Sequence, residues 1–170
     1  VYLTDGMSAS CHKAGFGKYD TSDGEINFHN IPNKLEDRRK MLRGEWPGNG
    51  CQHCKHIEQV KGMGKSDRQI HLHLENTTAP PELEHDLEAV DVTPRQVEIY
   101  WGNTCNQKCI YCAAHYSSQI HQEEKRFGYF DKEGVQLDHN KFTLNPNIER
   151  DTERLFAWFE KHIHELHKVF

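Results

Sequence analysis

The apolar and polar positions in the last third of the chain follow two distinct periods. Residues 96–101 alternate, which is the period of a β-strand with one buried face. Residues 146–167 repeat apolar side chains at helical spacing, which predicts one long helix. We expect its apolar stripe to be core, and it consists of Leu155, Phe156, Trp158, Phe159, Ile163 and Leu166. Residues 168–170 predict a second strand, so strand, helix and strand follow one another as in a parallel α/β unit.

Weaker patterns predict the remaining elements. A helix is expected over 33–43, with Asn33 as its cap, and a second short helix after Cys54. The alternation of His and Leu over 71–74 favours a strand. A further helix is expected over 113–125, and a loop or hairpin over 127–145.

These patterns divide the chain into three parts. Residues 1–75 form a small irregular module, and residues 76–94, which are acidic and proline-containing, read as a linker. Residues 95–170 begin an α/β domain. Both ends have the character of a piece cut from a longer protein.

Composition narrows the classes of function that the chain can have. Only 35% of the residues are hydrophobic and 28% are charged, which predicts a thin core or support from a cofactor. The net charge of -5 argues against nucleic acid as a partner. No apolar run is long enough to cross a membrane.

Five of the six cysteines fall in two tight groups. The first group is Cys51 and Cys54, preceded by the more distant Cys11, and the second is Cys105, Cys109 and Cys112. Such spacing suits metal or cluster ligation in a reducing cytoplasm better than it suits disulfides. We therefore expect a cytoplasmic metalloprotein.

In the second group, three thiolates lie on one compact loop at the end of the predicted strand. Three thiolates can bind three irons of a 4Fe–4S cluster and leave the fourth iron open to a substrate or cofactor. Two alternatives remain: a zinc site completed by His115, and a pure electron carrier, which would want a fourth cysteine.

At Cys105, Cys109, Tyr111 and Cys112 the chain resembles the radical S-adenosylmethionine superfamily, whose signature is C-x3-C-x-aromatic-C. The resemblance implies a partial (β/α) barrel, with a cluster that reductively cleaves S-adenosylmethionine to start radical chemistry. It implies that Tyr111 lies near the adenine. An electron donor and an unknown peptide or small-molecule substrate would be the partners.

The spacing of the first group leaves the identity of its metal undecided. Cys11, Cys51 and Cys54 could hold an auxiliary iron–sulfur cluster or zinc, with a histidine as a further ligand. The candidate histidines are His12, His53 and His56. A non-catalytic zinc module with two cysteine knuckles is the rival interpretation for the whole chain.

The order of motifs is similar to that of twitch-domain-containing radical S-adenosylmethionine proteins of phage and marine metagenomes. The motifs that carry this likeness are 3–6, 10–12, 38–46, 51–58, 66–68, 96–112 and 115–119. The likeness favours an auxiliary cluster in the first module. The superfamily's Gly-Gly-Glu-Pro-like stretch is absent, so we expect a truncated barrel that is inactive alone.

Overall fold

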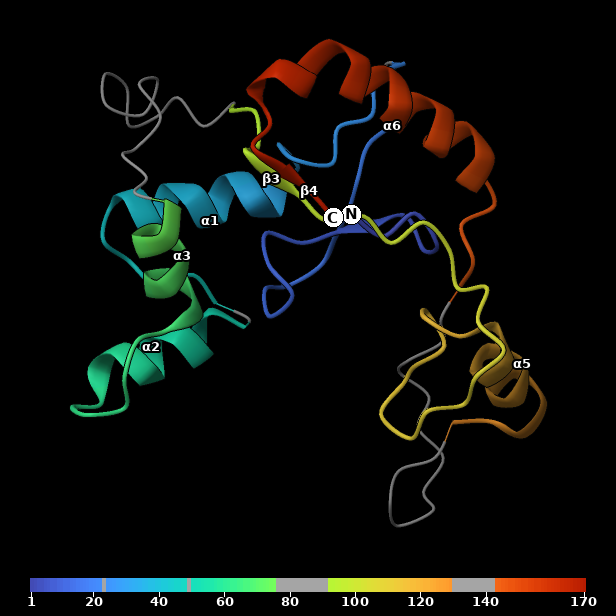
Figure 1. Cartoon of the computed structure of the whole chain (residues 1–170), viewed down its shortest axis with the longest axis horizontal. Coiled ribbons are helices and arrows are strands. Elements are labelled where there is room, and N and C mark those ends of the chain that lie inside the picture. Colours follow the sequence, from blue (N-terminus) through green and yellow to red (C-terminus); the bar gives the residue numbers. More distant parts are fainter. Residues whose placement is uncertain (23, 49, 76–91, 130–142) are drawn as a thin grey trace. The chain divides into compact units, whose positions relative to one another are not determined.

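The computed structural model describes residues 1–22, 24–48, 50–75, 92–129 and 143–170 (Figure 1). The chain forms two compact units, each built from segments distant in sequence. Unit 1 contains Val1–Met7, Thr21–Ile26 and Gln96–Phe170, and unit 2 contains Ser8–Asp20 and Asn27–Arg95. The predicted linker lies largely outside the described residues, as does most of the predicted hairpin. No helix in the described part of the chain is long and apolar enough to span a membrane.

Unit 1 contains the predicted parallel strand pair. Strand β3 (Gln96–Val97) pairs in parallel with β4 (Lys168–Val169), and Ile99 N donates to Phe170 O at 2.9 Å. Val97 and Ile99 are buried, as the alternation predicts, whereas Trp101 is 43% exposed. The fold class is therefore mixed α/β with small sheets.

The N-terminus lies along the other edge of the β3 segment. Tyr2 forms a parallel bridge with Tyr100, Leu3 N donates to Tyr100 O at 3.0 Å, and Tyr100 N donates to Val1 O at 2.8 Å. Leu3 is fully buried. Three extended segments therefore lie side by side. They are the start of the chain, the segment before the second cysteine group, and the end of the chain.

The long predicted helix is confirmed as α6 (Ile148–His162), followed by the short 3-10 helix η1 (Ile163–Glu165). Leu155 and Trp158 are buried, but Phe156 is 54% and Ile163 is 65% exposed. The predicted stripe was therefore too wide. The indole of Trp101 stacks on the Phe156 ring at 5.2 Å, so that pair forms a partly exposed aromatic contact instead of core.

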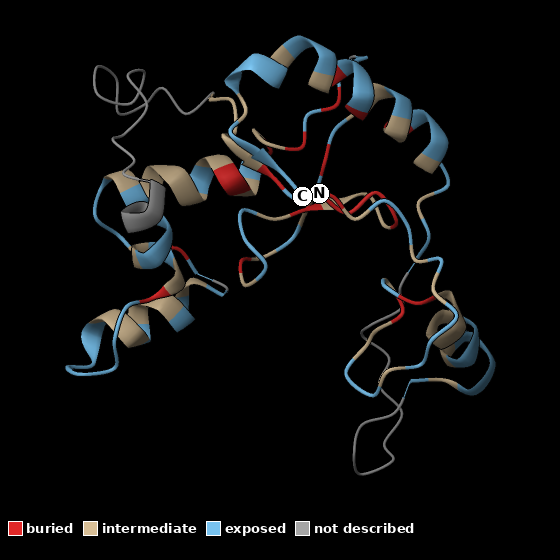
Figure 2. Ribbon diagram, in the orientation of Figure 1, coloured by how far each residue is buried: buried red, intermediate tan, exposed pale blue. Residues whose placement is uncertain are grey.

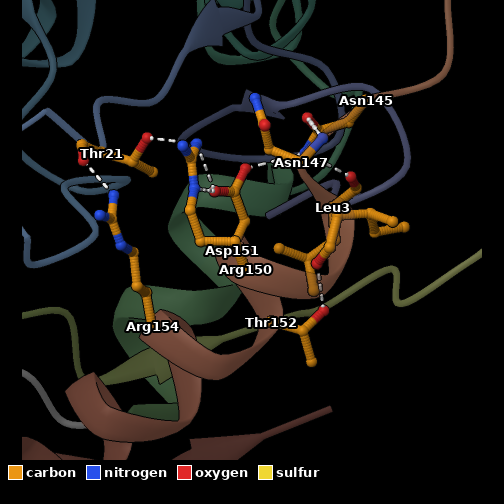
Figure 3. A network of polar contacts seen from close by, with 9 residues as sticks. Leu3, Thr21, Asn145, Asn147, Arg150, Asp151, Thr152 and Arg154 are labelled. Atoms are coloured by element: carbon orange, nitrogen blue, oxygen red, sulfur yellow. Dashed lines mark hydrogen bonds and ion pairs between the residues drawn. The ribbon is translucent and has the colours of Figure 1, made fainter.

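A polar network holds the start of α6 to the N-terminal segment (Figure 3). Asn145 Nδ2 donates to Asp151 Oδ2 at 2.8 Å and to Leu3 O at 3.1 Å. The Arg150 guanidinium donates to Asp151 Oδ1 and to Thr21 Oγ1, both at 3.1 Å. Asp151 is 3% exposed, so this carboxylate is a buried hub with several partners.

The described residues of unit 2 contain three helices and all but the first residue of a two-stranded sheet. The sheet consists of β1 (Met7–Ser8) and β2 (Gly17–Lys18). Helix α1 (Pro32–Leu42) matches the prediction over 33–43, but Pro32 occupies its first turn, so Asn33 is not the cap. The fixed φ of proline suits this position.

The other two helices correct the sequence-based predictions. Helix α2 (Cys51–Gln59) starts at Cys51 and not after Cys54, and α3 (Asp67–Glu75) replaces the strand expected over 71–74. Ser66 explains α3, because Gln69 N donates to Ser66 Oγ at 3.2 Å while Ser66 N donates to Gln69 Oε1 at 3.1 Å. This reciprocal capping box starts a helix locally and overrides the alternation.

A lysine lies inside unit 2. Lys34 is 5% exposed, and its Nζ donates to Ser8 Oγ at 2.7 Å and to Phe28 O at 2.9 Å. Burial, with the nearby Arg38 guanidinium, lowers the pKa of Lys34 to about 7. Burial also lowers the pKa of the adjacent His29 to about 3, which keeps this ring neutral.

Lys34 gives unit 2 a predictable pH dependence. The folded state binds the Lys34 proton more weakly than the unfolded state does, so stability rises with pH between the folded pKa of about 7 and the ordinary value of 10.5. The gain from this residue is about 3 kcal/mol between about pH 7.5 and about pH 10. Urea unfolding at a series of pH values, with Lys34→Met as the comparison, isolates this contribution. A wild-type slope equal to that of Lys34→Met would contradict it.

Helix α5 (Ser118–Phe127) begins later than the predicted 113–125. Ser117 caps it, and the residues between Gly102 and Ser117 form the cysteine loop. Figure 2 shows that most of this loop and of α5 is exposed or half-buried.

Candidate functional site

The cysteine loop presents all three thiols of the second group as free, half-buried side chains at Cys105, Cys109 and Cys112. Its backbone turns twice, because Cys105 N donates to Asn103 O at 2.7 Å and Cys112 N donates to Cys109 O at 2.9 Å. Cys109 Sγ lies 3.8 Å from Gln107 Oε1, and Cys112 Sγ lies 3.8 Å from Ala113 O. All three sulfur atoms therefore belong to one short surface loop.

Hydrogen bonds close this loop at its base. Asn103 Nδ2 donates to Ala114 O at 3.0 Å, and Ser118 N donates to Asn103 O at 2.6 Å. Asn103 therefore ties the beginning of the loop to its end.

Two serine hydroxyls reach back into the loop. Ser117 Oγ donates to Gln107 O at 2.9 Å and lies 3.3 Å from Cys105 O, and Ser118 Oγ donates to Cys105 O at 3.2 Å. Ser117 is fully buried and also accepts from Ile120 N at 3.4 Å as the cap of α5. Neither hydroxyl was predicted to have a role, although a serine before a helix is a recognisable cap.

The tip of the loop is open to solvent. Ile110 is fully exposed and Tyr111 is 89% exposed. The Cys109 thiol beside the Tyr111 hydroxyl raises the pKa of that tyrosine. An exposed aliphatic and an exposed aromatic side chain between two thiols leave room for a molecule to approach them.

His115, the proposed fourth zinc ligand, is engaged elsewhere in unit 1. Its ring lies 3.9 Å from the Tyr116 ring and meets the Tyr2 ring edge-on at 6.3 Å. Burial lowers the pKa of His115, opposed by the charge of Asp5. The structure thus places this imidazole in an aromatic cluster, where Tyr2 stacks on Tyr100 at 4.4 Å.

The first cysteine group comes together within unit 2. Cys51 and Cys54 share one face of the first turn of α2, since they are three residues apart on a helix. Burial raises the pKa of the Cys51 thiol, and the charges of Asp37, Cys11 and Cys54 raise it further. The charge of Cys11 therefore acts on Cys51 although the two are distant in sequence.

A fixed cation accompanies these thiols. The Arg68 guanidinium donates to both carboxylate oxygens of Glu58 and lies 4.4 Å over the Trp46 ring. Glu58 is the main cause that raises the pKa of Arg68, and the charges of Cys54 and Cys51 add to it. Arg68 lies in the 66–68 motif of the family likeness, but no role was predicted for its charge, because nothing local to it marks the approach of the cysteines.

The donor types fit the groups that the sequence predicts. Thiolates are the preferred ligands of iron–sulfur clusters and are common ligands of zinc. Within the described ranges, no three His, Cys, Asp or Glu side chains already stand in metal-binding positions.

Comparison of the chain with protein-family models, with curated proteins and with solved structures found no match.

Proposed function

We propose that this chain is part of a radical S-adenosylmethionine enzyme, with Cys105, Cys109 and Cys112 as the ligands of a 4Fe–4S cluster. When bound, the cluster supplies the electron that reductively cleaves S-adenosylmethionine. The observation that carries the proposal is the placement of three accessible thiols on one loop, closed at its base and following the β3 segment.

The surroundings of the loop support this proposal. Sites in parallel α/β proteins lie beyond the carboxyl ends of the strands, where this loop begins. Tyr111 offers an exposed aromatic ring for the adenine. The barrel itself, an electron donor, a cytoplasmic location and a peptide or small-molecule substrate belong to the proposal.

We propose Cys11, Cys51 and Cys54 as ligands of an auxiliary site for an iron–sulfur cluster or zinc. Two geometric observations support this assignment. Cys51 and Cys54 lie in the first turn of α2, and the turn that contains Cys11 approaches Gly50, the residue before that helix, through Lys13 O. The fixed Arg68 guanidinium would compensate part of the negative charge that thiolates bring.

Anaerobic reconstitution of the full chain with iron and sulfide tests the proposal. We expect iron and sulfide in amounts that fit a 4Fe–4S cluster, and an EPR signal of the reduced protein that changes when S-adenosylmethionine is added. Cys109→Ser should remove this response, whereas Cys51→Ser should leave it in place, because Cys51 belongs to the other group.

Two results would contradict the assignment. A wild-type chain that binds only zinc at Cys105, Cys109 and Cys112 would support the interaction-module interpretation. An EPR signal lost equally in Cys109→Ser and Cys51→Ser would place all the iron in one shared site.

A further inference from the structure

Asn103, Ser117 and Ser118 form a clasp around the second cysteine group, and none of the three is itself a ligand. Asn103 closes the base of the loop through Ala114 O and the Ser118 amide. The two serines hold carbonyls inside the loop, on either side of Asn106. Together these contacts fix both the ends and the interior of the segment that carries Cys105.

The donor and acceptor capacity of a hydroxyl determines which contacts Ser117 can make at the same time. A serine hydroxyl has one proton to donate and two lone pairs to accept with. Ser117 gives its proton toward Gln107 O at 2.9 Å, with Cys105 O at 3.3 Å as a second acceptor, and it accepts from Ile120 N. One buried side chain thus joins the first turn of α5 to the backbone of the cysteine loop.

Cys105 receives most of this support. Its carbonyl is approached by the Ser117 hydroxyl at 3.3 Å and by the Ser118 hydroxyl at 3.2 Å. Because Ser117 directs its one proton mainly to Gln107 O, the Ser118 hydroxyl is the main donor to Cys105 O. This hydrogen bond and the one on Gln107 O restrain the backbone on both sides of Asn106 without metal. Among the described residues, the serine hydroxyls of the loop reach the carbonyls of Cys105 and Gln107 and not those of Cys109 and Cys112, which lie near the exposed tip.

We infer that the clasp of Asn103, Ser117 and Ser118 preorganises the cysteine loop for its cluster, and that these three are positioning residues. The inference rests on the proposed function, which it deepens. In a preorganised loop, part of the ordering entropy of the ligand-bearing chain is lost on folding and not on metal binding. Cys105 would then serve as the fixed ligand, toward which the more mobile tip closes.

The test begins on the metal-free full chain with Ser117→Ala, Ser118→Ala and the double variant. Hydrogen exchange at the amides of Cys112 and Ser118 reports on the loop, because both amides donate within it. We expect about fivefold faster exchange for each single variant, the factor that corresponds to one lost hydrogen bond, and more for the double variant. Loss of iron to a chelator after reconstitution should accelerate by a similar factor.

Matched variants distinguish the loss of the hydroxyl contact to the loop from a weakening of helix α5. Ser118→Ala should not weaken α5, because alanine is the best helix former, so faster exchange in this variant reflects the lost hydroxyl. Gln119→Ala lies in the same helical turn and should leave exchange and iron retention unchanged. Ser118→Thr keeps a hydroxyl and should restore both. Far-UV circular dichroism identifies any variant that fails to fold.

The possible failures are distinguishable. The proposed function is read from the wild type alone, which must bind a cluster and respond to S-adenosylmethionine. The role of the clasp is tested by the differences in amide exchange and iron retention between the variants and the wild type. A double variant with wild-type exchange and wild-type iron retention would overturn the clasp while the proposed function stands. A wild type that takes up no iron would end both the proposed function and the role of the clasp in cluster binding.

Discussion

Gly50→Ala should unfold or severely distort unit 2, with a loss of stability above about 3 kcal/mol. Gly50 has a φ of +80°, which costs an alanine about 1–2 kcal/mol by itself. A Cβ at this position would also lie 1.4 Å from Lys13 O. No non-bonded contact between a carbon and an oxygen atom allows that distance, so the backbone of one segment must move.

The clash matters because of what the two segments carry. Lys13 lies in the turn closed by Ala14 N donating to Cys11 O, and Gly50 immediately precedes Cys51. The close approach that only glycine permits therefore brings the turn of Cys11 to the start of α2. We expect Gly50→Ala to separate the first cysteine group and to lower metal retention at that group.

Urea unfolding and hydrogen exchange check this prediction. Amides of α1 and α2 should exchange faster in Gly50→Ala, while amides of α6 in unit 1 should not change. Gly64→Ala is the matched control, since Gly64 has a φ of +90° but no atom within 4 Å of the added Cβ. Equal losses in Gly50→Ala and Gly64→Ala would show that the conformation of the residue, and not the approach to Lys13, sets the cost.

Asp151→Ala should destabilise unit 1 by about 3 kcal/mol. The carboxylate is buried and accepts from Asn145 Nδ2 at 2.8 Å and from the Arg150 guanidinium at 3.1 Å. Without it, Asn145 loses a charged acceptor and its hold on Leu3 O weakens. The N-terminal segment should therefore loosen from α6.

Glu149→Ala is the control for this experiment. Both acids lie in the first turn of α6 and interact favourably with the helix dipole, but Glu149 is exposed. We expect a loss below about 1 kcal/mol for Glu149→Ala. Thermal unfolding together with exchange at the amide of Leu3 measures both variants. If the two losses are similar, the dipole and not the buried network accounts for the role of Asp151.

Local patterns determined much of this protein. The helical period placed α6, the alternation and the apolar end placed β3 and β4, and the cysteine spacing separated two groups of thiols. The capping box at Ser66 was equally local and was overlooked, so the strand predicted over 71–74 was wrong. These features depend on residues a few positions apart, whose geometry the backbone sets directly.

Tertiary structure decided what depends on distant residues. The pairing of Tyr2 with Tyr100, the stacking of Trp101 on Phe156 and the approach of the Cys11 turn to the start of α2 each join segments far apart in sequence. The clasp on Cys105 likewise needed the start of α5 to fold back on the loop. Periodicity reports which face of an element is apolar, but only packing decides which surface covers that face and which polar group meets it.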